Sequence, residues 1–263
     1  MRVGWLADVY EPPGGAELTQ AEFRAAAPAG VQVVDVPPTA LERLRDCDVA
    51  CIHNSIGYPP QTVAALAGRP ALRYWHDLAR PGGSGDPALV RWALEHATNV
   101  FTSPLHRERF PHALEREAHC IPPALDLTRL RAGRGAGRRQ RGACWLGSGQ
   151  HAGKGLIQAF EWAEANEPVD FWGPMAVPIA ETPRVRAKGP VPPEHVASIL
   201  RLYRRFVFLP TSPEPFGRAT VEAWAAGCEL VVNRNVGALH WLERPDALER
   251  AARDFWQMLG GLA

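Results

Sequence analysis

The sequence predicts an α/β protein in which strands alternate with helices and form parallel sheets. Three observations carry this prediction. Residues 206–238 have the pattern of a strand, a loop, a helix and a second strand, which is the unit of a parallel sheet. The N-terminal half repeats the same alternation. Between the halves lies the segment 129–141, with six arginines, three glycines and no apolar periodicity.

Composition and charge narrow the class of protein further. Hydrophobic residues at 46% and charged residues at 22% of 263 are ordinary for a globular protein, and a formal net charge of +1 predicts nothing about a polyanionic partner for the chain as a whole. The five cysteines are scattered and include no Cys-x-x-Cys pair. This pattern favours reduced thiols in the cytoplasm and argues against a zinc site. We expect no membrane span, because no apolar run reaches about 20 residues.

In the first half, two features near expected strand ends are candidates for function. We expect strands at 2–7, 31–36, 48–53, 71–77 and 99–103, with helices at 16–27 and 62–67. Ligands of parallel sheets bind at the carboxyl ends of strands, which is where His76 lies and, as a weaker candidate, His53. Gly14 and Gly15 open the first helix and would let a phosphate approach the backbone, although a plain turn explains them equally well.

The second half begins with a strand at 143–147 and a glycine-rich loop that contains Lys154. We then expect helices at 156–166, 196–205, 218–226 and 245–259 and strands at 169–173, 185–189, 206–209 and 229–232. The loop also suggests a dinucleotide site, as in an oxidoreductase. Such a site requires an acidic residue at the end of the next strand to bind the ribose hydroxyls. Here Asp170 lies at its start, which argues against this alternative.

Two carboxylates, Glu214 and Glu222, flank the expected start of the helix at 218–226, with seven residues between them. The helix N-terminus near Gly217 and Arg218 presents unpaired N–H groups and the positive end of the helix dipole, which together attract an anion. Carboxylates beside it can accept hydrogen bonds from hydroxyls. A ligand with a central diphosphate and a sugar at each end would use all of these groups. For Glu222 alone, an ordinary acidic residue on a surface helix is an equal alternative.

The string EPFGRATVEAWAAGCELVV resembles the donor-binding signature of retaining glycosyltransferases of the GT-B fold, in the large family 4 group. That signature carries E-x(7)-E. The matching positions are Glu214, Phe216, Gly217, Glu222, Ala223 and Gly227. The resemblance implies two Rossmann-like domains facing a central cleft, and transfer of a sugar from a nucleotide-diphosphate sugar, with retention at the anomeric carbon.

The resemblance also implies roles for individual residues. Glu214 would bind hydroxyls of the transferred sugar, Glu222 the ribose, Lys154 the diphosphate, and His76 the sugar. We therefore expect catalytic roles for His76 and Glu214, and donor binding by Gly14, Gly15, Lys154, Phe216, Gly217, Arg218 and Glu222. The chain departs from the family at Ser148, where an arginine that binds phosphate is usual. Arg218 and Arg107 are candidates to replace it.

The expected domains are 1–128 on the acceptor side and 142–263 on the donor side, joined by a linker at 129–141. The last helix either packs on its own domain or crosses back to the first. We expect no metal ion and no cofactor, with a UDP-sugar as the co-substrate. The acceptor would be a saccharide or, because the arginine run suits a polyanion, a modified base in DNA. The alternatives are an inactive nucleotide-sugar-binding protein and a nucleic-acid-binding protein that uses the arginine run.

Overall fold

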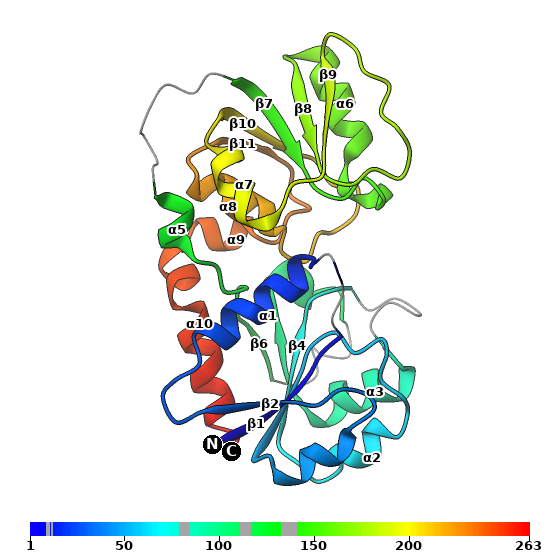
Figure 1. Cartoon of the computed structure of the whole chain (residues 1–263), viewed down its shortest axis with the longest axis vertical. Helices are drawn as coiled ribbons and strands as arrows, with labels where there is room; N and C mark the ends of the chain where they lie inside the picture. The colour runs from blue at the N-terminus through cyan, green and yellow to red at the C-terminus, as the bar shows by residue number, and fades with distance from the viewer. Residues whose placement is uncertain (9–10, 12, 79–84, 111–116, 133–140) are drawn as a thin grey trace. The chain divides into compact units, whose positions relative to one another are not determined.

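A computed structural model describes residues 1–8, 11, 13–78, 85–110, 117–132 and 141–263 (Figure 1). The chain divides into two compact units. Unit 1 comprises Met1–Leu125 and Glu243–Ala263, and unit 2 comprises Asp126–Leu242. Each unit contains one parallel sheet with helices packed against it. The predicted α/β class is confirmed.

Unit 1 contains a six-stranded sheet in the order β2-β1-β3-β4-β5-β6. The chain passes from β1 to β2 on one side and then returns to β3 on the other side of β1, so the strand order reverses at β1 and β3. The elements of this unit are β1 (Arg2–Leu6), α1 (Gly15–Ala25), β2 (Gln32–Asp35), η1 (Leu41–Asp46), β3 (Val49–Ile52), α2 (Thr62–Leu66), β4 (Ala71–Trp75), α3 (Pro87–His96), β5 (Thr98–Phe101), α4 (Pro104–Arg107), β6 (Ala118–Cys120) and α10 (Pro245–Gly260).

Alternate residues along the strands of unit 1 form two cores, one on each face of the sheet, as a buried parallel sheet requires. Strand residues such as Leu6, Ile52 and Trp75 lie in one core with Leu66 of α2 and Leu89 of α3. The other core combines neighbouring strand residues with side chains of α1 and α10: Trp5, Cys51, Tyr74, Phe23, Phe255 and Trp256.

Helix α10 belongs to unit 1, beside α1, although it is far from α1 in sequence (Figure 1). The rings of Phe23 and Phe255 stack at 4.1 Å between centroids, and Trp256 Nε1 donates to the Phe23 carbonyl at 2.8 Å. The apolar face of α10 is thus buried in the core that it shares with α1. Of the two expected positions of the last helix, α10 therefore has the one in the first domain, and unit 2 ends at Leu242 rather than at residue 263.

Unit 2 contains a five-stranded parallel sheet in the order β11-β10-β7-β8-β9. The expected helix 196–205 ends at Leu200, and its last three residues instead begin strand β10. The elements are α5 (Leu127–Arg131), β7 (Arg141–Leu146), η3 (Ala152–Lys154), α6 (Leu156–Ala165), β8 (Val169–Trp172), β9 (Val185–Gly189), α7 (Pro193–Leu200), β10 (Tyr203–Phe208), α8 (Arg218–Ala225), β11 (Glu229–Val232) and α9 (Leu239–Leu242).

The start of the arginine run is helical and packs in unit 2, which differs from the expected linker 129–141. Asp126 Oδ1 caps α5 by accepting from the Arg129 amide at 2.9 Å. The guanidinium of Arg131 lies 5.3 Å from the centre of the Trp224 ring in α8, and Arg201 donates to the Arg129 carbonyl. These packing contacts explain why the helix forms. Residues 133–140 of the run lie outside the described residues.

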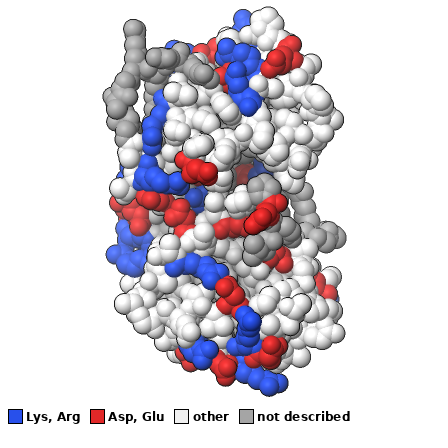
Figure 2. All heavy atoms as spheres, viewed as in Figure 1, with Lys and Arg blue, Asp and Glu red and all other residues white. Residues whose placement is uncertain are grey.

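Charges of both signs are mixed on the surface. On the face shown in Figure 2, Lys and Arg side chains of the described residues lie next to Asp and Glu side chains. Ion pairs such as Arg24–Asp35 and Arg250–Asp254 also join charges of opposite sign. The mixture agrees with the net charge of +1.

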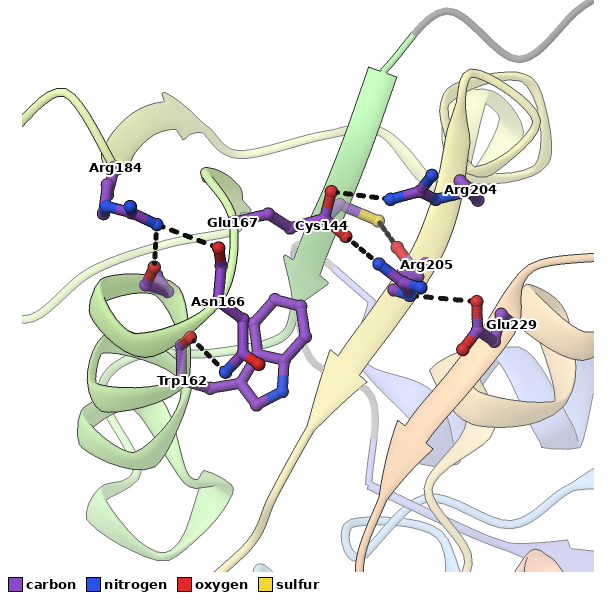
Figure 3. Close-up of polar contacts among 9 residues, drawn as sticks. Cys144, Trp162, Asn166, Glu167, Arg184, Arg204, Arg205 and Glu229 are labelled. Carbon is purple, nitrogen blue, oxygen red and sulfur yellow. Dashed lines mark hydrogen bonds and ion pairs between the residues drawn. The ribbon is translucent and has the colours of Figure 1, made fainter.

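A network of ion pairs joins strands at the amino end of the unit 2 sheet (Figure 3). Glu167, just before β8, accepts from Arg204 at 2.9 Å and from Arg205 at 2.6 Å, and Arg205 also donates to Glu229 at 2.9 Å. Partial burial alone would raise the pKa of Glu167. The hydrogen bonds from Arg205 and Arg204 outweigh that effect, so its pKa lies below the usual value.

The Glu167→Gln variant should lower the free energy of unfolding by about 1 kcal/mol at neutral pH, since it removes a carboxylate that accepts from two arginines. Because the pKa of Glu167 is lower in the folded state, its carboxylate stabilises the fold at pH values above the unfolded-state pKa of about 4.3. This stabilisation is lost as the pH falls through the folded-state pKa. The difference between variant and wild type should therefore vanish in acid. Urea unfolding across this range measures it, with exposed Glu161→Gln as the control. A difference that does not change with pH would contradict the assignment.

Candidate functional site

The predicted site residues of unit 2 lie at the carboxyl ends of β7 and β10. The chain leaves β7 toward β8 and β9 on one side and returns to β10 on the other side, so β7 and β10 are neighbours whose following loops diverge. In open parallel sheets this reversal of strand order is the usual position of a ligand site. Lys154 follows β7, while the segment from Glu214 to Glu222 follows β10.

The loop after β7 approaches the loop after β10 closely at two glycines, and at Gly155 the neighbouring backbone leaves no room for a side chain. A Cβ atom on Gly153 would lie 2.2 Å from Ser212 Oγ, and one on Gly155 would lie 2.1 Å from the Leu209 carbonyl oxygen. Gly155 also has a φ of +73°. The Thr211 amide donates to the Gly153 carbonyl at 3.1 Å. These contacts hold Lys154, which lies between the two glycines, at the loop after β10.

Helix α8 begins directly after its N-cap Gly217, whose φ of +81° turns the chain into the helix. The preceding loop is held by the segment after β11: the Glu214 amide donates to Asn235 O at 2.7 Å, and Ala238 donates to Phe216 O at 2.7 Å. Within the described residues, the amides of Phe216 and Gly217 donate to no acceptor. Two N–H groups thus join the positive end of α8, which suits an anion.

Four charged side chains of this site form two ion pairs. Lys154 Nζ lies 2.5 Å from Glu214 Oε2, and Arg218 Nε lies 2.9 Å from Glu222 Oε1. Glu222 is buried, with 8% of the residue exposed, and the pair with Arg218 provides the partner that a buried carboxylate needs. The structure therefore brings together all of the predicted site residues that lie in unit 2: Lys154, Glu214, Phe216, Gly217, Arg218 and Glu222.

Ser148, which stands where the resembled family has an arginine, follows β7 and has no cationic group. Its carbonyl accepts from the His151 amide at 3.3 Å. Of the two candidates to replace the arginine, Arg218 lies in this site, paired with Glu222. Arg107 lies in α4 of unit 1.

The predicted glycines Gly14 and Gly15 lie at the start of α1 in unit 1. The Gly14 amide donates to Glu17 Oε2 at 2.9 Å, so its N–H group is already used as part of a helix cap. A Cβ atom on Gly15 would meet nothing within 4 Å. The fold of the chain itself does not require glycine at Gly15.

His76 lies just after β4 in unit 1, partly buried, and contacts the weaker candidate His53. The His76 Nε2 atom lies 2.8 Å from His53 Nδ1. Burial lowers the pKa of His76 to about 3, with further lowering by the Arg73 guanidinium. The imidazole is therefore neutral at physiological pH. The sequence does contain a signal for His53, because it lies at the end of the strand next to the one that His76 follows.

Two asparagines that were not among the predicted site residues fix the loop after β10. Asn233 and Asn235 each donate a side-chain amide to the Pro210 carbonyl, at 2.9 and 2.8 Å. Both asparagines follow β11. Their two hydrogen bonds to one carbonyl connect the segment after β11 to the loop after β10. The spacing Asn-x-Asn directly after a strand is the only trace of this role in the sequence.

Two further observations concern membrane spans and metal ions. No helix among the described residues is long and apolar enough to cross a membrane. In the same part of the chain, no group of three or more His, Cys, Asp or Glu side chains is arranged to hold a metal ion.

Comparisons with known proteins identify the fold. No family model matches the chain, and no curated protein matches it. Solved structures do match. HepE from Anabaena in complex with UDP-glucose is 16% identical, with a TM-score of 0.67 over 100% of this chain and 95% of that chain. AviGT4, a glycosyltransferase involved in avilamycin A biosynthesis, is 19% identical, with a TM-score of 0.62 over 100% and 89%.

A third match is an alpha-glucosyltransferase in complex with UDP-glucose and DNA containing an abasic site. It is 13% identical, with a TM-score of 0.63 over 96% of this chain and 90% of that chain. Together with the two parallel sheets, these likenesses show that the chain has the GT-B fold of glycosyltransferases.

Proposed function

We propose that this protein is a retaining glycosyltransferase that transfers a sugar from a UDP-sugar to an acceptor hydroxyl without a metal ion. The observation that carries the proposal is the convergence of Lys154, Glu214 and Glu222 with the N-terminus of α8 at the strand reversal of unit 2. The fold is that of glycosyltransferases, and two structures of similar fold contain UDP-glucose. These likenesses support UDP as the nucleotide.

Each group has a role in this proposal. Lys154 and the free amides of Phe216 and Gly217 bind the diphosphate and offset the charge that develops on it as the sugar leaves, which is the work a metal ion does elsewhere. Glu222 accepts from the ribose hydroxyls, while Glu214 accepts from the transferred sugar. His76 of unit 1 contacts that sugar. Gly14 and Gly15 border the phosphates, and Arg218 holds the Glu222 carboxylate in place.

The reaction breaks the bond between the anomeric carbon and the diphosphate oxygen. The acceptor oxygen attacks from the same face, and its proton passes to the leaving phosphate, so configuration is retained. The acceptor is a saccharide or a modified base in DNA. One structure of similar fold contains DNA. A cytoplasmic location fits the five free cysteines.

A donor screen tests the proposal. UDP-, GDP- and ADP-sugars are added to the protein in EDTA, and thermal shift and release of the nucleoside diphosphate are followed. We expect a UDP-sugar to raise the melting temperature and to be hydrolysed slowly. Saccharides and DNA with hydroxymethylated bases are then offered as acceptors, and the anomeric configuration of the product is read by NMR.

The same screen separates the alternatives. Donor binding without turnover in the presence of every acceptor would favour an inactive nucleotide-sugar-binding protein. DNA binding that weakens steeply with salt, with no response to any donor, would favour a nucleic-acid-binding protein. Inverted configuration in the product, or turnover abolished by EDTA, would contradict the retaining or the metal-independent part of the proposal.

A further inference from the structure

Cys51 and His53, which have no role in the proposed function, form a hydrogen-bonded chain with His76. Strands β3 and β4 are neighbours, and Cys51 and His53 are two residues apart at the end of β3. Cys51 Sγ lies 3.3 Å from His53 Nε2, and His53 Nδ1 lies 2.8 Å from His76 Nε2. Both ring nitrogens of His53 are therefore engaged.

The His53 ring is fixed by its surroundings. It is fully buried and stacks on Trp5, with 4.3 Å between ring centroids and 29° between ring planes. Tyr74 and Phe255 lie near it at 5.8 and 6.3 Å. A flip of the ring would place carbon atoms against Cys51 and His76 and break both contacts, which is costly for a buried polar group.

Both imidazoles are neutral at physiological pH. Burial, with the nearby His76 and Arg73, lowers the pKa of His53 well below its usual value, and the pKa of His76 is lowered to about 3. Each ring therefore carries one proton. Since a single hydrogen can lie between His53 Nδ1 and His76 Nε2, the tautomer of one ring determines that of the other.

Two arrangements of protons satisfy this constraint. In the first, the Cys51 thiol donates to His53 Nε2, His53 Nδ1–H donates to His76 Nε2, and His76 carries its own proton on Nδ1. In the second, both bonds are reversed and the thiol hydrogen has no acceptor within the described part of the chain. The first arrangement is favoured, because a buried donor without an acceptor is destabilising.

We propose that Cys51 and His53 are positioning residues that fix His76 as the Nδ1–H tautomer, so that His76 offers a hydrogen-bond donor to the bound substrate. Nδ1 has no partner among the described residues, so it is free to donate. The part that concerns the substrate rests on the proposed function. A donor at this nitrogen can bind a sugar oxygen and cannot accept the proton of the acceptor hydroxyl. That proton must then pass to the leaving phosphate.

Long-range ¹⁵N–¹H NMR of labelled protein tests the tautomer directly, because it distinguishes a protonated ring nitrogen from an unprotonated one. His53→Asn and His76→Gln assign the signals. We expect both rings of the wild type to be protonated at Nδ1 at neutral pH. In Cys51→Ala the thiol donor is lost, and we expect His53 and His76 to become mixtures of tautomers. Protonation of His76 at Nε2 in the wild type, or no change in Cys51→Ala, would overturn the proposal.

Kinetics test the positioning role. Asparagine places its Nδ2–H₂ group near the position of His53 Nδ1 and keeps the bond to His76, whereas leucine cannot donate. His53→Leu should lower kcat about tenfold without changing the affinity for the UDP-sugar, while His53→Asn should keep most of the wild-type kcat. Equal kcat in the two variants, at matched melting temperatures, would overturn the role. If no donor is turned over at all, the proposed function fails, and the NMR result still decides the tautomer.

Discussion

Replacing Lys154 by methionine should lower kcat/KM for the sugar donor by about two to three orders of magnitude, since it removes a preorganised cation from the diphosphate. A second effect adds to the first. Lys154 Nζ lies 2.5 Å from Glu214 Oε2, and Glu214 is mostly buried. Without the ammonium, the Glu214 carboxylate loses its partner beside an incoming anion, which opposes donor binding.

The experiment compares Lys154→Met with Lys188→Met, which replaces the chain's other, exposed lysine. Steady-state kinetics and calorimetric titration with UDP separate turnover from binding. Lys188→Met should match the wild type. The double variant Lys154→Met with Glu214→Gln should recover part of the lost UDP affinity but not the turnover. A kcat/KM within about threefold of the wild type in Lys154→Met would exclude the assigned role.

Glu222→Gln should weaken UDP binding by about 30-fold, because hydrogen bonds to a charged group are worth about 2 kcal/mol. The carboxylate is buried, and its Oε1 accepts from Arg218 at 2.9 Å, which leaves Oε2 to accept from the ribose hydroxyls. The amide of glutamine keeps the shape of the side chain. It removes the charge and replaces one acceptor oxygen with a donor.

The ribose role of Glu222 is tested by comparing UDP with 2′,3′-dideoxy-UDP. Wild-type protein should prefer UDP strongly, and Glu222→Gln should lose most of this preference because it loses the partner of the missing hydroxyls. Glu194→Gln, at an exposed position in α7, is the matched control and should retain the preference. If Glu222→Gln discriminates between the two ligands as well as the wild type does, Glu222 does not bind the ribose.

Local sequence patterns predicted the sheets well where apolar runs are uninterrupted and failed where charged residues pack against distant partners. Residues 206–209 gave a clear strand, but the basic residues before them hid its start at Tyr203. Arg205 belongs in that strand because Glu167 and Glu229 pair with it, and neither is near it in sequence. Helix α5 was hidden in the same way, since the contact between Arg131 and Trp224 is a tertiary one.

The candidate site likewise contains features that the local sequence predicts and features that depend on contacts between distant residues. The common position of Glu214, Gly217 and Glu222 could be predicted because they lie on one continuous loop and helix, so their spacing alone determines how close they are. The pairing of Lys154 with Glu214 could not be predicted, because the two residues are 60 positions apart and meet only when β7 lies next to β10. The contact between His53 and His76 likewise depends on which strands are neighbours.

The division of the chain has a consequence for protein synthesis. Helix α10 packs with Trp5 and Phe23 in one core, and all of unit 2 is made after these two residues and before α10. On a ribosome, domains usually fold in the order in which they emerge. Here unit 2 can complete its core first, while the part of unit 1 that precedes it keeps aromatic surface exposed until residues 243–263 leave the exit tunnel. We therefore expect chaperones that bind exposed apolar surface to bind this part of unit 1 during translation.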